Sequence, residues 1–301
     1  MRTRVKGLIA ALAGVAFIVI VIGSYVIVAQ TAITGEWKAD GRQRTDDKIY
    51  LSFERHSDKG NRNQNGSTYS YEDLKGLSRD PNGPVSFSIV REAGTIECQG
   101  NFAGGKGSGT FTFSPNRSFI DGMRSRGFDF EKYDDRHNGE VNDRLLTAAL
   151  INVTTALADD LNSANLGTLD VSDLFKAAIF QVNSEFIAEM KATGFPDLKM
   201  EDLVKARIFK IDANYVRQVR DMGFDKEDFE GLVKFRIFKV TPEFLSELRS
   251  EGFNDLSAEQ VVKFRIFNID SDFIRRAKAS EPNITVEQLV QMKIGVRRSS
   301  N

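Results

Sequence analysis

The chain has 301 residues, a formal net charge of −1 and 28% charged residues. It therefore lacks the basic surface with which proteins bind nucleic acid. Its single cysteine excludes an intrachain disulfide, and with only two histidines it is too poor in His and Cys for a typical zinc cluster. We expect neither a nucleic-acid partner nor a cofactor.

The N-terminus carries a segment typical of exported proteins. Basic residues at the very start precede an uncharged, apolar stretch over residues 8–29. About 20 apolar residues span a bilayer, whereas the apolar part of a signal peptide has about 7–15. The length favours an uncleaved anchor over residues 1–32, with the basic end in the cytoplasm and the bulk exported. The alternative is a signal peptide cleaved near Ala29 or Ala32, which would leave a secreted or periplasmic protein.

Residues 33–114 have the pattern of a small antiparallel β domain. Short runs alternate polar and apolar residues, as half-buried strands do, and turns rich in Gly, Asn and Pro separate them. These runs are residues 48–53, 85–90, 95–98 and 110–113. We expect a meander or a small sandwich, with the polar, glycine-rich segment 57–68 as a loop.

Residues 100–106 of this domain match the first seven positions of a phosphate-binding P-loop. The eighth position should be Ser or Thr, which holds magnesium, but Gly107 stands there. The segment also leads into the alternating run 110–113 and not into a helix. It therefore predicts a β-hairpin. Trp37 is a candidate ligand contact in the same domain, with core packing as the alternative role.

The rest of the chain is repetitive. An apolar residue recurs every 29 residues, at Val153, Val182, Ile211, Val240 and Ile269. A good N-cap residue follows each of them, and another apolar residue comes four positions after the cap, which is the spacing of a hydrophobic staple. The predicted first helices end at Gly194, Gly223 and Gly252, or at Asn165 in the earliest of these units. A fixed period of this length indicates stacked helix pairs.

Two degenerate units extend this array to six helix pairs over residues 115–301. Residues 116–128 match a first helix, and a nine-residue insertion that holds His137 follows them. The last unit loses the Gly-Phe stop and one residue. Second helices are expected to begin at caps such as Asp170, Asp228 and Ser257, while Lys199 is a weaker start.

Three arginines in the repeats are candidate functional residues: Arg207, Arg236 and Arg265. Each lies four positions after an apolar residue of the second helix and so shares its apolar face, where a charge has to be paired. The expected partners are Glu185, Glu243 or Asp272, or exposed helix-end carbonyls. One interpretation is a structural ladder between repeats. The other is a basic stripe that faces a ligand.

The residues of an enzyme are not assembled anywhere in the sequence. No histidine lies near a candidate nucleophile, and no HExxH motif is present. Pairs of adjacent carboxylates such as Asp159 and Asp160 fit an ordinary helix surface. We expect a protein without catalytic activity.

Residues 240–261 resemble a known repeat. It is similar to those found C-terminal to the membrane zinc-peptidase domain in bacterial beta-lactam-sensor/antirepressor-like proteins, the bla regulator family. Residues 37–113 resemble the β segment that can precede such repeats. The peptidase domain and its zinc motif are absent, so no catalytic residue carries over. The resemblance implies a bacterial, extracytoplasmic module attached to envelope sensing or regulation.

Together these features predict an α+β protein with an N-terminal transmembrane helix, an antiparallel β domain and solenoid-like helical hairpins. We expect a single-pass protein of the bacterial inner membrane whose periplasmic repeats act as a scaffold for a protein partner. The alternative is an envelope protein whose β domain binds a small molecule, lipid or glycan.

Overall fold

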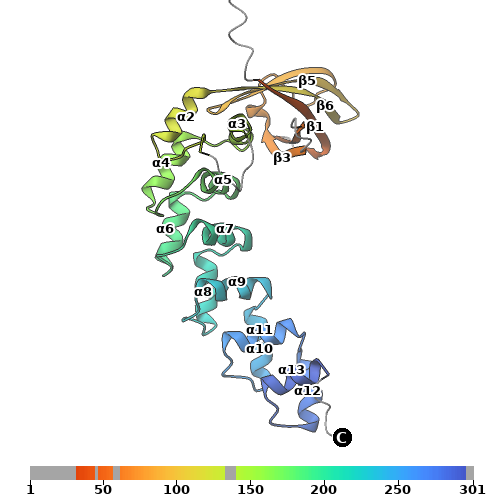
Figure 1. Ribbon diagram of the computed structural model, residues 1–301. Helices are drawn as coiled ribbons and strands as arrows, with labels where there is room; N and C mark the ends of the chain where they lie inside the picture. Colours follow the sequence, from red (N-terminus) through yellow and green to blue (C-terminus); the bar gives the residue numbers. More distant parts are fainter. Residues whose placement is uncertain (1–31, 45–46, 57–61, 133–139, 296–301) are drawn as a thin grey trace, which may run out of the picture. The chain divides into compact units, whose positions relative to one another are not determined.

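A computed structural model describes residues 32–44, 47–56, 62–132 and 140–295 (Figure 1). Over these residues the α+β prediction is confirmed, with a six-stranded antiparallel sheet followed by 12 α-helices. The chain forms two compact units. The first comprises the chain up to Asp159 together with Leu169–Phe175, and the second comprises Asp160–Thr168 and Lys176–Asn301.

The sheet consists of two three-stranded meanders joined side by side. The strand order is β3-β2-β1-β6-β5-β4, with every neighbouring pair antiparallel. The strands are β1 (Ile33–Arg44), β2 (Lys48–His56), β3 (Arg62–Ser70), β4 (Gly83–Arg91), β5 (Gly94–Ala103) and β6 (Lys106–Pro115), with a 3-10 turn, η1 (Tyr71–Asp73), after β3. The described strands form one sheet and not the alternative sandwich, but they do not form a single meander, because the consecutive strands β3 and β4 lie at opposite edges.

Helix α3 (Val141–Leu150) covers the core of this sheet. It packs against β5 and β6, and Arg55 of β2 forms an ion pair with Asp143 of the helix. The hydroxyl of Tyr69 in β3 donates to the Leu150 carbonyl over 3.1 Å. Strands that are far apart in the strand order thus meet the same helix, so the sheet curls around it.

The prediction of a loop over residues 57–68 is wrong for residues 62–68, which belong to the edge strand β3. They pair with β2 in continuous register, including Tyr50 with Thr68, while the side chains from Gln64 to Thr68 are exposed. The backbone of β2 supplies the hydrogen bonds, so this edge strand needs no apolar alternation. Gly66 also suits this place, because a Cβ there would lie 2.0 Å from the Tyr50 hydroxyl.

The helices follow one another as six pairs, each with a first and a second helix. The first helices are α2 (Arg117–Arg124), α4 (Thr155–Ser163), α6 (Ser184–Ala192), α8 (Ala213–Asp221), α10 (Pro242–Ser250) and α12 (Ser271–Ser280). The second helices are α3, α5 (Val171–Phe180), α7 (Met200–Phe209), α9 (Phe229–Ile237), α11 (Ala258–Ile266) and α13 (Val286–Lys293). Within the second compact unit, α9 packs beside α7, α11 beside α9 and α13 beside α11.

The predicted caps of the first helices are confirmed. Asn183 accepts a hydrogen bond from the Phe186 amide over 2.9 Å, and Asp212 accepts one from Tyr215 over 2.8 Å. Thr154, Thr241 and Asp270 do the same in their helices. The glycines and the asparagine at the opposite ends have positive φ, from +52° at Asn165 to +100° at Gly223, as the predicted stops require.

The second helices end in a different way, which the sequence pattern did not reveal. Each of α5, α7, α9 and α11 is followed by a residue in the left-handed conformation, at Gln181, Lys210, Lys239 and Asn268, with φ between +48° and +56°. Left-handed backbone costs an L-residue roughly 1–2 kcal/mol, and glycine avoids this cost. The lysines at these turns are therefore unusual.

Two predictions fall on residues that the structure does not describe. The predicted anchor lies almost wholly within residues 1–31, and His137 lies in the segment 133–139. Among the described residues, no helix is both long and apolar enough to pass through a membrane.

Candidate functional site

The three candidate arginines stack on aromatic rings. The Cζ atom of Arg207 lies 3.7 Å from the ring centroid of Phe186, and that of Arg265 lies 3.7 Å from Phe244. Arg236 lies 3.6 Å from the centroid of Tyr215. In each case the ring belongs to the first helix of the same pair. A cation over a ring face gains about 0.5–2 kcal/mol, so these contacts bind the two helices of a pair together.

Two of these arginines also reach the previous repeat through helix-end carbonyls. A terminal nitrogen of Arg207 donates to the Gln181 carbonyl over 2.7 Å, and one of Arg236 donates to the Lys210 carbonyl over 2.8 Å. Of the two kinds of partner expected from the sequence, the described residues thus show the carbonyls and no carboxylate. These contacts favour the structural ladder over a stripe that faces a ligand.

A second ladder, which the sequence analysis missed, joins the first helices. Near the end of each of the last four first helices, α6, α8, α10 and α12, a basic side chain donates to a carbonyl at the end of the preceding first helix. Lys191 donates to Ala164 over 2.8 Å and Arg249 to Met222 over 3.0 Å. Arg220 and Lys278 repeat the contact at Thr193 and Glu251. The 29-residue period of these basic residues was the available signal.

The surface of the second helices carries a feature with no such structural explanation. Five large isoleucines are exposed, with exposed fractions between 46% and 56%. They are Ile179, Ile208, Ile237, Ile266 and Ile294, and we call them the isoleucine row. Each is one of the last two residues of a second helix or directly follows one. The steps are 29 residues, except for the last one of 28, where the final unit has lost a residue.

No family model matches the chain, and no curated protein is significantly similar to it. The isoleucine row is therefore identified from its geometry and exposure. Apart from Val90, its members are the only large hydrophobic residues with this degree of exposure among the described residues. A regular apolar surface of this kind marks a binding site more often than scattered exposed residues do.

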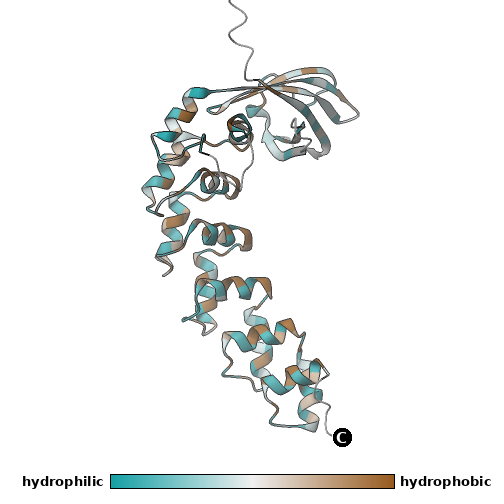
Figure 2. Cartoon of the chain, viewed as in Figure 1, coloured by the Kyte–Doolittle hydropathy of each residue, from teal (hydrophilic) through white to brown (hydrophobic). Residues whose placement is uncertain are grey.

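Hydrogen bonds join the ends of the helices that carry the first three members of the row. Arg207 directly precedes Ile208 and binds the Gln181 carbonyl, two residues beyond Ile179. The same relation joins Arg236 to Lys210, two residues beyond Ile208. Figure 2 shows hydrophobic residues recurring along these stacked helices. The phenylalanines that follow the first four isoleucines are half-buried and extend the apolar surface inwards.

Ion pairs between second helices neutralise the nearby carboxylates. Lys176 binds Glu201 over 2.8 Å, Lys205 binds Glu230, and Lys263 lies 3.7 Å from Glu287. By contrast, the exposed Lys210 and Lys239 form no ion pair with a described residue. The turns beside the row thus carry two exposed lysines, and the exposed caps Asp212 and Asp270 follow at the starts of the next first helices.

Trp37, the candidate contact of the β domain, is fully buried. Its Nε1 donates to the Gln99 carbonyl over 3.1 Å, and its ring meets Phe87 edge-on with centroids 5.2 Å apart. These contacts are those of a core residue. Cys98 is buried nearby in β5, and burial raises the pKa of its thiol to about 12. It is therefore protonated and a poor nucleophile at neutral pH.

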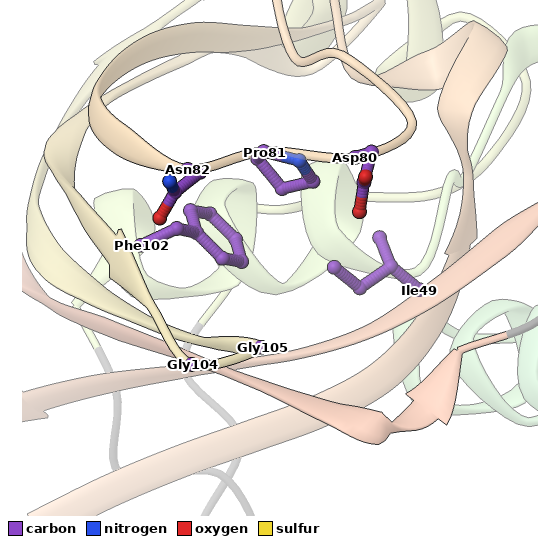
Figure 3. A pocket seen from close by; sticks show the side chains of 7 residues that line it. All are labelled: Ile49, Asp80, Pro81, Asn82, Phe102, Gly104 and Gly105. Atoms are coloured by element: carbon purple, nitrogen blue, oxygen red, sulfur yellow. The ribbon is translucent and has the colours of Figure 1, made fainter.

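The β domain also holds a small cavity of about 280 Å³ (Figure 3). Its lining residues are Ile49, Asp80, Pro81, Asn82, Phe102, Gly104 and Gly105. Asp80 and Asn82 lie across from the buried side chains of Ile49 and Phe102, so the cavity has an apolar floor and a polar side. Trp37 does not line it. The two glycines form the turn between β5 and β6, which confirms the hairpin predicted for the P-loop-like segment.

Proposed function

We propose that this protein is a membrane-anchored, extracytoplasmic scaffold that binds a protein partner along the isoleucine row and has no catalytic activity. The observation that carries the proposal is the exposure of one isoleucine at the same place in each of five successive helix pairs. In solenoid-like proteins, neighbouring repeats present equivalent residues on one continuous surface, and partners bind there.

Energetic reasoning supports a binding role for the row. The buried core of the repeats already includes staple residues such as Ile187 and Val216, so the row is not needed to stabilise the pairs. An exposed apolar side chain gains about 25 cal/mol for each Å² that a partner covers. Five such side chains supply the apolar centre of an interface, and the charged residues around them supply a polar rim.

The location is part of the same proposal. The basic and apolar N-terminal segment supports an inner-membrane anchor with the repeats in the periplasm. The resemblance of residues 240–261 to repeats of the bla regulator family supports a role in envelope sensing or regulation. A cleaved signal segment would give the same scaffold in secreted or periplasmic form.

Photo-crosslinking in cells tests the scaffold. A photoreactive amino acid replaces Ile208 or Ile237 of the row, and, as a matched control, the exposed Ser246 of first helix α10. We expect a discrete protein adduct of the same mass from both row positions in the envelope fraction, and none from the control. Equal labelling at all three positions, or none, would contradict the proposal.

The cavity favours a second candidate function, a β domain that binds a small molecule, lipid or glycan. Its volume lies near the lower end of the range for ligand pockets, and it combines apolar and polar walls. Fluorescence of anilinonaphthalene sulfonate tests this function. Saturable one-to-one binding that disappears in Asn82→Trp, where the new side chain fills the cavity, would support it. Equal binding by both proteins would exclude the cavity as the site.

A further inference from the structure

The residues around the isoleucine row indicate which kind of partner it binds. This inference rests on the proposed scaffold function. Five short segments surround the row: residues 178–181, 207–210, 236–239, 265–268 and 293–295. These segments contain no carboxylate, and their exposed cations are Lys210, Lys239, Lys293 and the ladder residue Arg207, whereas Arg236 and Arg265 are half-buried in the ladder. A surface of this composition is complementary to a partner that carries both apolar and acidic side chains.

The last repeat preserves the pattern despite its missing residue. Lys293 takes the place of the arginine, with its Nζ 4.6 Å from the ring centroid of Phe273, and Ile294 directly follows it. The combination of a stacked cation and an exposed isoleucine thus persists in α13. The row consequently has the same chemistry from α7 to its end.

The spacing of the row selects the conformation of the partner. Packed helices lie about 8–10 Å apart, so this is the expected step from one isoleucine to the next. A polyproline II segment rises about 3.1 Å per residue and has three residues per turn, which gives a step of about 9 Å. Every third side chain of such a segment points to the same side. Successive side chains on that side can therefore contact successive isoleucines of the row.

Two of the cations beside the row stand at left-handed turns, which also end other second helices at Gln181 and Asn268. Lys210 and Lys239 adopt φ of +53° and +52° although glycine is the residue that suits such turns. Strained backbone is an observation from which function is reasonably inferred. Both lysines are exposed next to the row, where their charge is available to a partner.

We infer that the isoleucine row binds an extended acidic segment of a partner protein, with an apolar residue at every third position and carboxylates between them. A second copy of this chain does not fit, because two rows face to face would oppose cations to cations. A lipid surface fits less well. Interfacial helices bury an apolar face about 5–10 Å deep in the membrane, whereas only about half of each isoleucine is exposed.

Fluorescence anisotropy with the full 301-residue chain tests the inference. The probe is a fluorescein-labelled peptide of five Leu-Pro-Glu triplets, and a peptide of five Leu-Pro-Lys triplets is its counterpart. We expect saturable binding of the acidic peptide that weakens with added salt, and no binding of the basic one. The double variant Ile208→Ser/Ile237→Ser should weaken binding at least about tenfold, because it removes two apolar contacts from the centre of the row.

A charge variant separates binding from folding. Lys210→Gly/Lys239→Gly removes two cations beside the row and relieves left-handed backbone, so it should weaken binding several-fold without lowering the melting temperature. The matched control, Lys226→Ser/Arg276→Ser, removes two exposed cations away from the row and should leave binding unchanged. Equal effects of both double variants, or none of either, would overturn the inference.

The remaining outcomes distinguish this inference from the proposed function. If crosslinks from Ile208 and Ile237 persist but the acidic peptide does not bind, the scaffold stands and the acidic partner is wrong. If neither is seen, both fail. If the peptide does not bind and Ile208→Ser/Ile237→Ser weakens association with phosphatidylcholine/phosphatidylglycerol vesicles, the row faces lipid and the inference is overturned.

Discussion

Arg236 joins three helices through two contacts, because its guanidinium lies 3.6 Å above the ring of Tyr215 and also donates to the Lys210 carbonyl over 2.8 Å. The ring belongs to α8, the carbonyl follows α7, and the arginine itself belongs to α9. One side chain therefore fixes the two helices of its own pair and the end of the previous pair. This contact also aligns the helix ends that carry the isoleucine row.

The first prediction concerns this ladder. Arg236→Met should lower the free energy of unfolding by about 1–3 kcal/mol, since it removes a stacked cation and a charge-assisted hydrogen bond. Arg276→Met is the control, because Arg276 is exposed, and it should change stability by less than about 0.5 kcal/mol. Urea denaturation followed by helical circular dichroism measures both. Equal losses in the two variants would show that the ladder has no special role.

The second prediction concerns the phenol under Arg236. The Tyr215 hydroxyl is buried, and no described residue satisfies it, whereas the equivalent positions carry Phe186 and Phe244. Tyr215→Phe should therefore leave the free energy of unfolding unchanged at neutral pH or raise it by up to about 1 kcal/mol. A loss larger than about 1 kcal/mol would mean that the hydroxyl has a partner.

The same residue predicts a pH dependence. Burial raises the pKa of Tyr215 to about 12, although the Arg236 cation acts in the opposite direction. The unfolded phenol has a pKa near 10, so folding favours the neutral form. Its contribution is complete below pH 10 and is lost as the pH rises towards 12. Between pH 9 and pH 11, Tyr215→Phe should lose less stability than the unchanged protein, as urea midpoints will show. Identical losses would contradict the assignment.

The sequence predicts the repeats well because their signals are local. The caps at Asn183 and Asp212 and the stop at Gly223 depend on residues within one turn, and all three occur in the structure as expected. Strand β3 was not predicted because its signal is not local. Its residues carry no apolar alternation, and only pairing with β2 makes them a strand.

The isoleucine row shows a further limit. In the sequence, Ile208 and its equivalents look like apolar positions of an amphipathic helix, which are normally buried. Their exposure depends on how far each helix is rotated against its neighbours, and this is a property of the packed repeats. The burial of Trp37 is likewise set by Phe87, which lies on another strand.

The third prediction concerns the ladder of the first helices. Arg249 caps the carbonyl end of the preceding first helix at Met222, and Arg220 does the same at Thr193. Arg220→Met/Arg249→Met should lower the stability and broaden the unfolding transition, because repeats unfold together only while neighbours are coupled. Arg217→Met/Arg276→Met is the control, since both arginines are exposed and neither bonds to a described residue of another repeat. A transition that keeps its width would show that these contacts do not couple the repeats.

The fourth prediction compares the two turns that flank helix α8. Gly223 has φ of +100°, and a Cβ there would have its nearest neighbour 3.9 Å away, at an Arg249 nitrogen. Space is therefore available, and Gly223→Ala should cost about 1–2 kcal/mol through backbone conformation alone. At Lys210, with φ of +53°, Lys210→Gly should instead raise stability by about 0.5–1 kcal/mol.

Lys226 supplies the control for these opposite signs. It is an exposed lysine in the loop between α8 and α9 and does not have positive φ. Lys226→Gly should therefore destabilise the protein slightly, because glycine gains freedom in the unfolded chain and relieves nothing in the folded one. Thermal and urea unfolding of the three variants measure the set. A gain in stability from both lysine substitutions would reflect a general effect of removing charge. A gain from Lys210→Gly alone would show that the left-handed backbone at this lysine costs stability.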